Sequence, residues 1–235
     1  MNIVQYSGKL PLREYRRQET GVARRNDHSR EEIRNMVLDA AEKIVAEEGC
    51  KGLSARKLAS AIDYTVGTLY LVFENLDDIV QQVNQRTLDD MYDWLATRSG
   101  NASTPGDALL ALAKAYIAYA EAQANRWNML FDYVSESGNA LSEGYRQKVG
   151  RVFGLVEASL APLTNRNSPT EVQQVARVLW ASVHGICMLK IRQRMDFVGG
   201  LSAEAMVHLL IDNFLRGFGG QEAESGCAVF RDDPQ

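Results

Sequence analysis

Apolar residues recur every three or four positions along most of this 235-residue chain, which is the spacing of one buried face of an α-helix. After Thr104 the chain shows neither the alternation of a half-buried strand nor the turn signal of a hairpin. The pattern therefore predicts an all-α protein. The expected helical segments are Ser29 to Gly49, two short ones between Ser54 and Tyr70, Asn75 to about Ser99, one starting at Thr104, the aromatic-rich Asn125–Val134, Leu141 to Leu160, Ser168 to about Met195 and Ser202 to Gly219.

Capping signals mark the starts of several of these helices. Ser29 and Glu32 form a capping box, in which each side chain bonds the backbone amide of the other residue. The start at Ser168–Glu171 adds a proline at the first helical position, where proline is favoured. The helix that follows is apolar on nearly every side from Val175 to Leu189, so we expect it to be buried. The apolar stripe of the last helix, by contrast, has no obvious partner within one chain.

The stretch Ser54–Phe73 predicts two short helices around a tight turn. Ser54 and Thr65 are the expected N-caps of these helices. Asp63 lies in the turn, and aspartate is one of the few non-glycine residues that tolerate a left-handed backbone. Two such helices, the second led by small polar residues, are typical of a helix-turn-helix. In that motif the second helix enters the major groove of DNA, where hydroxyl side chains contact bases and phosphates.

The same stretch resembles the DNA-binding segment of the TetR/AcrR repressors. The matching residues are Arg56, Leu58, Ala59, Thr65, Gly67, Thr68, Leu69, Tyr70 and Phe73. The chain departs from the family pattern at four positions. Asp63 replaces the usual glycine, and Val66 and Leu76 replace residues that are often lysine. Val72 replaces an aromatic residue or histidine that often contacts phosphate. Trp180, His184 and Gly185 also resemble the W-H-G signature of one TetR C-terminal domain subfamily.

The resemblance implies a ligand-responsive repressor that binds as a homodimer to a pseudo-palindromic double-stranded DNA operator and is released by a small, largely apolar effector. The expected organisation is a flexible basic arm over residues 1–28, a three-helix helix-turn-helix domain over 29–74, a helical effector-binding and dimerisation domain over 75–219, and a disordered tail over 220–235. In such proteins the last two helices usually form a four-helix bundle with the partner. No cofactor and no membrane partner is expected.

Three sets of candidate site residues follow. The DNA-binding set is Arg24, Arg25, Ser54, Arg56, Lys57, Tyr64, Thr65, Val66, Gly67, Thr68 and Tyr70. The effector-binding set is Tyr116, Trp127, Phe131, Tyr133, Phe153, Trp180, His184 and Met188. The dimer-interface set is Ser182, Gly185, Val207, Leu210, Ile211, Phe214, Leu215 and Phe218. Two interpretations of His184 stay open, because it is either the polar anchor of an effector pocket or a hydrogen-bonded core residue.

Charge is distributed unevenly along the chain, whose net charge is −4. Residues 1–25 contain six lysines and arginines against two glutamates, so a basic arm precedes an acidic body. No lysine or arginine occurs between Lys57 and Arg86, and the expected recognition helix therefore carries no cation. Arg24 and Arg25 lie just before the Ser29 cap, close enough to reach an adjacent minor groove.

Two other function classes remain open. One is a redox-sensing regulator that uses Cys50, Cys187 or Cys227, and the other is an all-helical enzyme or ligand carrier with no DNA role. Catalysis has no positive support, since no nucleophile–base pair, phosphate loop or paired-carboxylate arrangement stands out. The three histidines lack metal-ligand spacing. No apolar run approaches the ~18–20 residues that span a bilayer, and the N-terminus lacks a signal core, so we expect a cytoplasmic protein.

Overall fold

A computed structural model describes residues 28–100, 102–134, 141–163 and 168–219, and every regular element in these ranges is helical. The prediction of an all-α chain is confirmed. The α-helices are α1 (Arg30–Glu48), α2 (Ala55–Ala61), α3 (Val66–Leu69), α4 (Leu76–Ser99), α5 (Pro105–Ala122), α6 (Ala124–Asp132), α7 (Glu143–Leu160), α8 (Pro169–Ile191) and α9 (Ala203–Gly219). Short 3-10 turns occur at Cys50–Gly52, Ala161–Leu163 and Met195–Val198.

Local side-chain capping explains where the helices begin. The Ser29 hydroxyl accepts the Glu32 amide at 3.2 Å, and the Ser29 amide donates to the Glu32 carboxylate at 2.6 Å, which completes the predicted capping box. The side chains of Ser54, Asn75 and Ser168 cap α2, α4 and α8 in the same way, each accepting the amide three residues on. These predicted starts are confirmed. They could be predicted from the sequence because a cap depends on only four consecutive residues.

The turn between α2 and α3 also follows the sequence prediction. Asp63 has a φ of 57°, in the left-handed region that few non-glycine residues adopt. Thr65 then caps α3 by accepting the Thr68 amide at 3.3 Å. The capped turn sets the entry angle of a four-residue helix that is too short to be stable without tertiary packing.

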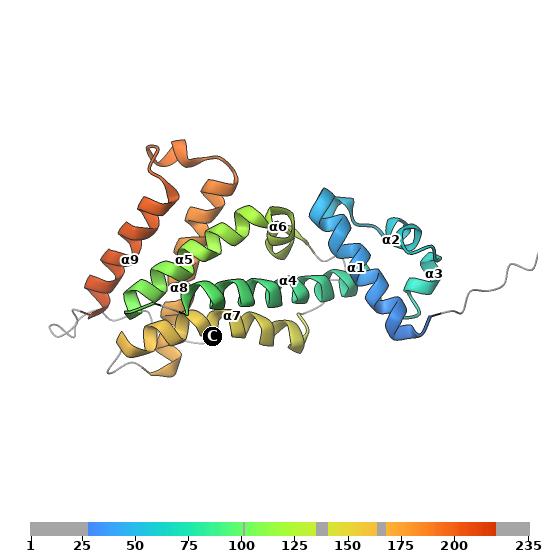
Figure 1. Cartoon of the computed structure of the whole chain (residues 1–235), viewed down its shortest axis with the longest axis horizontal. Coiled ribbons are helices and arrows are strands. Elements are labelled where there is room, and N and C mark those ends of the chain that lie inside the picture. The colour runs from blue at the N-terminus through green and yellow to red at the C-terminus, as the bar shows by residue number, and fades with distance from the viewer. Residues whose placement is uncertain (1–27, 101, 135–140, 164–167, 220–235) are drawn as a thin grey trace, which may run out of the picture.

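Figure 1 shows an elongated molecule in which a small head, α1–α3, lies at one end and α8 and α9 lie toward the other. The 24-residue α4 runs along the long axis and joins the head to the body. At 1.5 Å per residue this helix is about 36 Å long, as expected for a connector. Helices α5 and α6 pack along one side of α4 and α7 along the other (Figure 1).

The head and the body have separate apolar cores. The head core does not stop at residue 74, because Ile79, Val80 and Val83 of α4 are buried in it. Met129 of α6 is also fully buried there, although Trp127, two residues earlier, is fully buried in the body core. Two residues along a helix are about 200° apart, so opposite faces of α6 serve the two cores.

Helices α8 and α9 differ from the sequence predictions in three respects. Helix α8 ends at Ile191 rather than near Met195, because Gln193 takes a left-handed conformation with φ 54°. It is not buried on every side within one chain, since Val178 is 68% exposed. The stripe on α9 is not wholly unpartnered, because Val207 and Ile211 are buried in the chain's own body core.

Several sequence predictions fall outside the described residues. They are the basic arm with Arg24 and Arg25, the tail with Cys227, the loop over residues 135–139 and the side chain of Phe218.

Candidate nucleic-acid interface and effector cavity

The surface of the head is formed by α3 and the residues beside it. Thr65 and Gly67 are exposed, Tyr70 is 46% exposed, and Thr68 is half-buried. The hydroxyls of Thr65 and Thr68 lie 3.0 Å apart, so the cap also orients both groups. The buried face of α3 consists of Leu69 alone. The two threonine hydroxyls therefore lie together, and the Tyr70 side chain next to α3 is accessible.

Among the described residues, Gly67 has no close neighbour outside its own short helix. A Cβ at this position would meet only the Thr65 hydroxyl, at an ordinary contact distance of 3.7 Å. Packing against a neighbouring helix, one of the two reasons expected for this glycine, therefore does not explain it. Close approach of an external partner remains as the reason to be tested.

The remaining head residues of the DNA-binding set have mixed roles. Arg56 is exposed. The Lys57 ammonium forms an ion pair with Glu48 at the end of α1. Ser54 is occupied as the cap of α2, and the Tyr64 hydroxyl lies 2.8 Å from the His28 Nδ1. Val66 is half-buried and packs on the head core.

Two residues of the head surface are additional to the sequence prediction. Leu71, directly after α3, is 65% exposed, although it is apolar. Arg34 of α1 donates at 2.6 Å to the Val72 carbonyl and lies over the Phe73 ring, 4.8 Å from its centroid. Arg34 therefore fixes the end of the recognition segment against α1. Sequence reasoning missed this contact because its partners are nearly forty positions away.

The body contains two neighbouring apolar pockets that share lining residues, described below as the two lobes of one cavity. The aromatic lobe has a volume of about 110 Å³ and is lined by Leu88, Met91, Tyr116, Leu130, Phe131, Tyr145, Val149, Val152, Phe153 and Trp180. The aliphatic lobe has a volume of about 40 Å³ and is lined by Leu95, Leu109, Leu112, Ala113, Tyr116, Val152, Phe153, Val156, Leu179, Trp180, Val183 and Ile211. Four residues line both lobes, and none of the lining residues is charged.

His184 lies behind the wall of this cavity. Its Nδ1 is 2.9 Å from the Tyr116 hydroxyl, and its ring centroid is 4.6 Å from that of Phe131 and 4.9 Å from that of Trp180. Burial lowers the pKa of His184, so the imidazole is neutral at pH 7. The structure favours the second interpretation of His184, a hydrogen-bonded residue that orients Tyr116 from outside the lobes.

The predicted effector set divides into three groups. Tyr116, Phe131, Phe153 and Trp180 line the lobes, whereas Trp127 and His184 support them from behind. Met188 packs on the body core and lines neither lobe. Tyr133 does not belong to this cavity, because its hydroxyl donates to Asp77 at 2.5 Å at the start of α4. Periodicity could not separate these cases, since it does not tell which helix a face meets.

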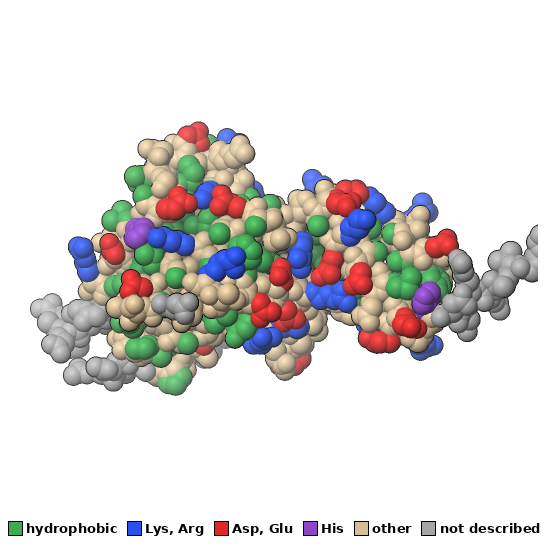
Figure 2. Space-filling model, viewed as in Figure 1, with side chains coloured by type: hydrophobic (Ala, Val, Ile, Leu, Met, Phe, Trp, Pro, Cys, Tyr) green, Lys and Arg blue, Asp and Glu red, His purple; other side chains and the backbone are tan. Residues whose placement is uncertain are grey.

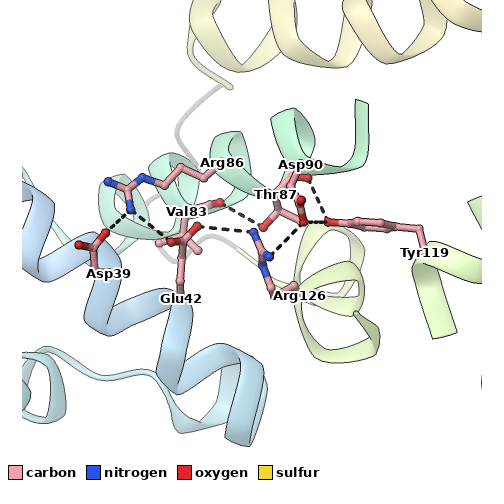
Figure 3. Close-up of polar contacts among 8 residues, drawn as sticks. All are labelled: Asp39, Glu42, Val83, Arg86, Thr87, Asp90, Tyr119 and Arg126. Atoms are coloured by element: carbon pink, nitrogen blue, oxygen red, sulfur yellow. Dashed lines mark hydrogen bonds and ion pairs between the residues drawn. The ribbon is translucent and has the colours of Figure 1, made fainter. Parts of the chain in front are cut away.

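A polar network joins the head to the body (Figure 3). Arg126 of α6 contacts Glu42 of α1 at 3.5 Å and Asp90 of α4 at 3.1 Å. Arg86 of α4 donates to the same Glu42 at 3.2 Å and to Asp39 at 2.6 Å. Figure 2 shows acidic and basic side chains gathered where the head meets the body.

The network extends into the body through Tyr119 of α5. The Tyr119 hydroxyl donates to Asp90 at 3.0 Å and to the Thr87 carbonyl at 3.3 Å, as drawn in Figure 3. Burial and the adjacent Asp90 carboxylate raise the pKa of Tyr119. The next residue after Arg126 is Trp127, whose ring packs on Tyr116 at 6.0 Å. Helix α6 therefore contacts the cavity wall and the head at once.

An open groove runs between α8 and α9 at the end of the body away from the head. It is lined by Val178, Leu179, Ser182, Ile186, Leu201, Met206, Leu209, Leu210, Asn213 and Phe214. Leu209 is 60% exposed and was not in the predicted interface set. Leu215 is half-buried and approaches Gly106 of α5, so it packs largely inside the chain. Gly185 is exposed and has open space where a side chain would be.

The described cysteines differ in environment. Burial raises the pKa of the Cys187 thiol to about 12, and Cys50 is half-buried in the head. The residues described by the structure hold no group of histidine, cysteine and acidic side chains able to bind a metal ion. Each helix in the described ranges is too short or too polar to cross a membrane.

A helix-turn-helix head on an all-helical body defines a helix-turn-helix regulator. Comparison with known families makes the assignment specific. The family described as "Bacterial regulatory proteins, tetR family" matches residues 37–83, and "Tetracyclin repressor-like, C-terminal domain" matches residues 109–214. The chain belongs to the TetR family of transcriptional regulators.

One curated relative, an uncharacterized HTH-type transcriptional regulator of Haemophilus influenzae, is 33% identical over 55 residues. The match covers 23% of this chain and 29% of that protein, so it spans less than a third of the relative's length.

Solved structures share the fold at low sequence identity. A protein of unknown function from Rhodococcus sp. RHA1 is 19% identical, with a TM-score of 0.64 over 79% of this chain and 94% of that one. A TetR-family regulator from Mesorhizobium loti is 17% identical, with a TM-score of 0.57 over 81% and 98%. FadR from Bacillus subtilis, in complex with stearoyl-CoA, is 14% identical, with a TM-score of 0.54 over 77% and 96%.

Proposed function

We propose that this chain is a homodimeric repressor that binds a pseudo-palindromic DNA operator and is released from it by a small, largely apolar effector. The two α3 helices would enter successive major grooves, about 34–36 Å apart along the duplex. The exposed Thr65, Gly67 and Tyr70 support this role, since small residues and hydroxyls allow close approach to bases and phosphates.

The cationic contacts of this interface are few. Lys57 is already paired with Glu48, and no cation lies between it and Arg86, so Arg56 and Lys51 are the exposed cations beside the motif. Phosphate neutralisation dominates the affinity of most DNA-binding proteins. We therefore assign most of the phosphate contacts to the basic arm, including Arg24 and Arg25.

The effector would bind in the two-lobed cavity of the body. Its lining is uncharged, and apolar surface with few polar groups is typical of small-molecule sites. FadR from Bacillus subtilis shares this fold and was solved in complex with stearoyl-CoA, and this supports a fold that can bind a ligand with an apolar chain. For a near-complete release, the effector must favour the non-binding conformation by about 5 kcal/mol.

The position of α6 is the observation that carries this proposal. Its Trp127 packs in the body core beside the cavity wall, its Met129 packs in the head core, and its Arg126 bonds the head and α4. A ligand that displaces the aromatic wall and moves α6 with it would change the contacts that orient the head. The cavity and the DNA-binding surface are thus linked by a single rigid element.

The proposed dimer interface is the groove between α8 and α9. The exposed Val178, Leu201 and Leu209 side chains of this groove are costly in water, and such a patch is typical of a protein interface. Val207 and Ile211 would contribute from beneath, by holding α9 against the body, rather than by touching the partner. Ser182 and Gly185 are small enough to allow the partner's helices to approach closely.

The redox alternative is not favoured for Cys187. A thiol with a pKa of about 12 is almost entirely protonated at neutral pH and is a poor nucleophile.

The proposal is tested by selecting bound duplexes from a random DNA pool with the full-length protein, followed by quantitative gel shift of the enriched sequence. We expect a two-fold-related sequence with half-sites one helical turn apart. Thr68→Ala should weaken binding of that sequence with little change in melting temperature. No enrichment over a mock selection would contradict the proposal. Native mass spectrometry of the purified protein then identifies any bound effector.

A further inference from the structure

The two lobes of the cavity differ in the chemistry of their walls. The aromatic lobe has five aromatic side chains in its wall, including Phe131 and Tyr145, which it does not share with the other lobe. Outside the four shared residues, the aliphatic lobe is lined only by leucine, isoleucine, valine and alanine. The two lobes adjoin at Tyr116, Val152, Phe153 and Trp180. A single molecule with two unlike parts would therefore match the walls better than a uniform one.

The sizes of the lobes limit each part of such a molecule. An apolar cavity of about 150 Å³ is enough to bind a benzene ring. The aromatic lobe, at about 110 Å³, approaches this size, and two residues of its wall, Val149 and Phe131, are partly exposed. The aliphatic lobe, at about 40 Å³, has room only for a short alkyl chain.

The polar groups of the walls are neutral. The Tyr116 and Tyr145 phenols lie in the wall of the aromatic lobe, and Tyr116 is held by His184. Asn84, one turn before Leu88 on α4, lies beside Tyr145 and is only 5% exposed. Its side-chain oxygen is the only buried side-chain oxygen of the described residues without a hydrogen-bond partner. Asn84 lines neither lobe, so the polar partners that the wall offers to a ligand hydroxyl are the Tyr116 and Tyr145 phenols.

The walls of the two lobes disfavour a charged ligand. Among the described residues, no lysine, arginine, aspartate or glutamate lines either lobe. An ionised carboxylate buried there would lose its hydration without gaining an ion-pair partner.

We propose that the effector is an uncharged aromatic molecule with one hydroxyl and a short alkyl substituent, whose ring occupies the aromatic lobe and whose alkyl group occupies the aliphatic lobe. The 4-alkylphenols have this chemistry. This inference rests on the proposed function only in naming the cavity as the effector site. It differs from an acyl-coenzyme A, which would place a long uniform chain in the cavity.

Isothermal titration calorimetry on the full-length protein without DNA tests the ligand class. The probes are 4-methyl-, 4-ethyl- and 4-propylphenol, with 4-propylbenzoate as the charged control and octanoyl-coenzyme A as the competing class. We expect Kd to fall about fourfold per added methylene, the equivalent of about 0.8 kcal/mol for each one buried. The benzoate should bind more weakly than 4-propylphenol by roughly tenfold or more. Equal affinities along the series, benzoate binding as tight as the phenol, or binding of octanoyl-coenzyme A alone would overturn the inference.

Two matched variants on α7 test how the ligand is oriented in the cavity. Val149 lines only the aromatic lobe and Val156 only the aliphatic lobe, and both are half-buried on the same helix face. Val156→Phe should remove the gain from the longer alkyl groups while 4-methylphenol still binds, and Val149→Phe should weaken every phenol. Melting curves confirm that each variant is folded. If Val156→Phe leaves the methylene dependence intact, the tail does not occupy the aliphatic lobe.

Failure of this inference and failure of the proposed function are distinguishable. The calorimetry uses no DNA, and the duplex selection uses no ligand. Selected DNA without phenol binding would reject only the ligand class, whereas phenol binding without any selected DNA would reject only the repressor.

Discussion

Replacing Arg126 by methionine tests whether the network at α6 couples the head to the body. The Arg126 side chain is 17% exposed, and its guanidinium contacts two carboxylates, Glu42 at 3.5 Å and Asp90 at 3.1 Å. Methionine keeps most of the apolar length of the side chain and removes both ion pairs. Neither carboxylate is left alone, because Glu42 keeps Arg86 and Asp90 keeps Tyr119.

The expected loss of stability is modest. The Arg126–Glu42 pair should contribute about 1 kcal/mol, the upper end of the range for exposed pairs, because both groups are more than half buried. The Arg126 Nε is buried without a hydrogen-bond partner, so its removal offsets part of the lost attraction. We expect a net loss of about 1 kcal/mol in the free energy of unfolding, which lowers Tm by about 2–4 °C for a chain of this size.

A double-mutant cycle isolates the pair. The free energy of unfolding is measured by urea denaturation for wild type, Arg126→Met, Glu42→Gln and the double variant, and we expect a coupling energy of about 1 kcal/mol. The matched control is Lys148→Met, which removes an ion pair with Asp89 on the side of α4 that faces α7. It should cost similar stability without touching the head.

The functional consequence is a weaker response to the effector. A coupling of about 1 kcal/mol corresponds to about fivefold in affinity, so effector should weaken DNA binding about fivefold less in Arg126→Met than in wild type. Effector affinity without DNA should change little, and Lys148→Met should respond like wild type. A coupling energy near zero, or an unchanged effector response in Arg126→Met, would refute the assignment of α6 as the connecting element.

Three further predictions follow from the head, the groove and the cysteines. Gly67→Ala should keep the free energy of unfolding or raise it by up to about 1 kcal/mol, because the added Cβ meets only the Thr65 hydroxyl, at 3.7 Å. The same variant should bind DNA more weakly in gel shifts. Tight DNA binding by this variant would mean that the duplex does not approach Gly67. Leu209→Glu should give monomers in sedimentation velocity, because it would bury an unpaired charge in the groove. The control His208→Glu changes the neighbouring exposed residue, which lies outside the groove, and should stay dimeric. A dimeric Leu209→Glu would place the interface elsewhere. Cys187, with a thiol pKa of about 12, should resist alkylation at pH 8 in the native state and react only after denaturation. Mass spectrometry measures the alkylation at this site. Rapid labelling of the native protein there would revive the redox alternative.

The basic arm provides a separate test of where the DNA-binding charge resides. Deleting residues 1–25 should flatten the dependence of log affinity on log salt by several units per dimer, since each phosphate contact adds about −0.9 to the slope. An unchanged slope would leave Lys51, Arg56 and backbone amides as the source of the phosphate contacts.

What the sequence alone determined about this protein was local. The caps at Ser29, Thr65 and Ser168 and the left-handed turn at Asp63 were predictable, because each depends on contacts within a few consecutive residues. The helix-turn-helix was recognisable for the same reason. Its cap, turn and buried leucine form one continuous stretch.

Tertiary structure decided which of two apolar faces meets which neighbour. Val207 and Leu209 lie two positions apart on α9, yet one is fully buried in the chain's own core and the other is 60% exposed. Tyr133 and Phe131 look alike in sequence, but one bonds the start of α4 and the other lines a cavity. Arg126 and Glu42 are more than eighty residues apart. Periodicity tells only that a face is apolar, whereas the partner of that face depends on how helices distant in sequence pack together.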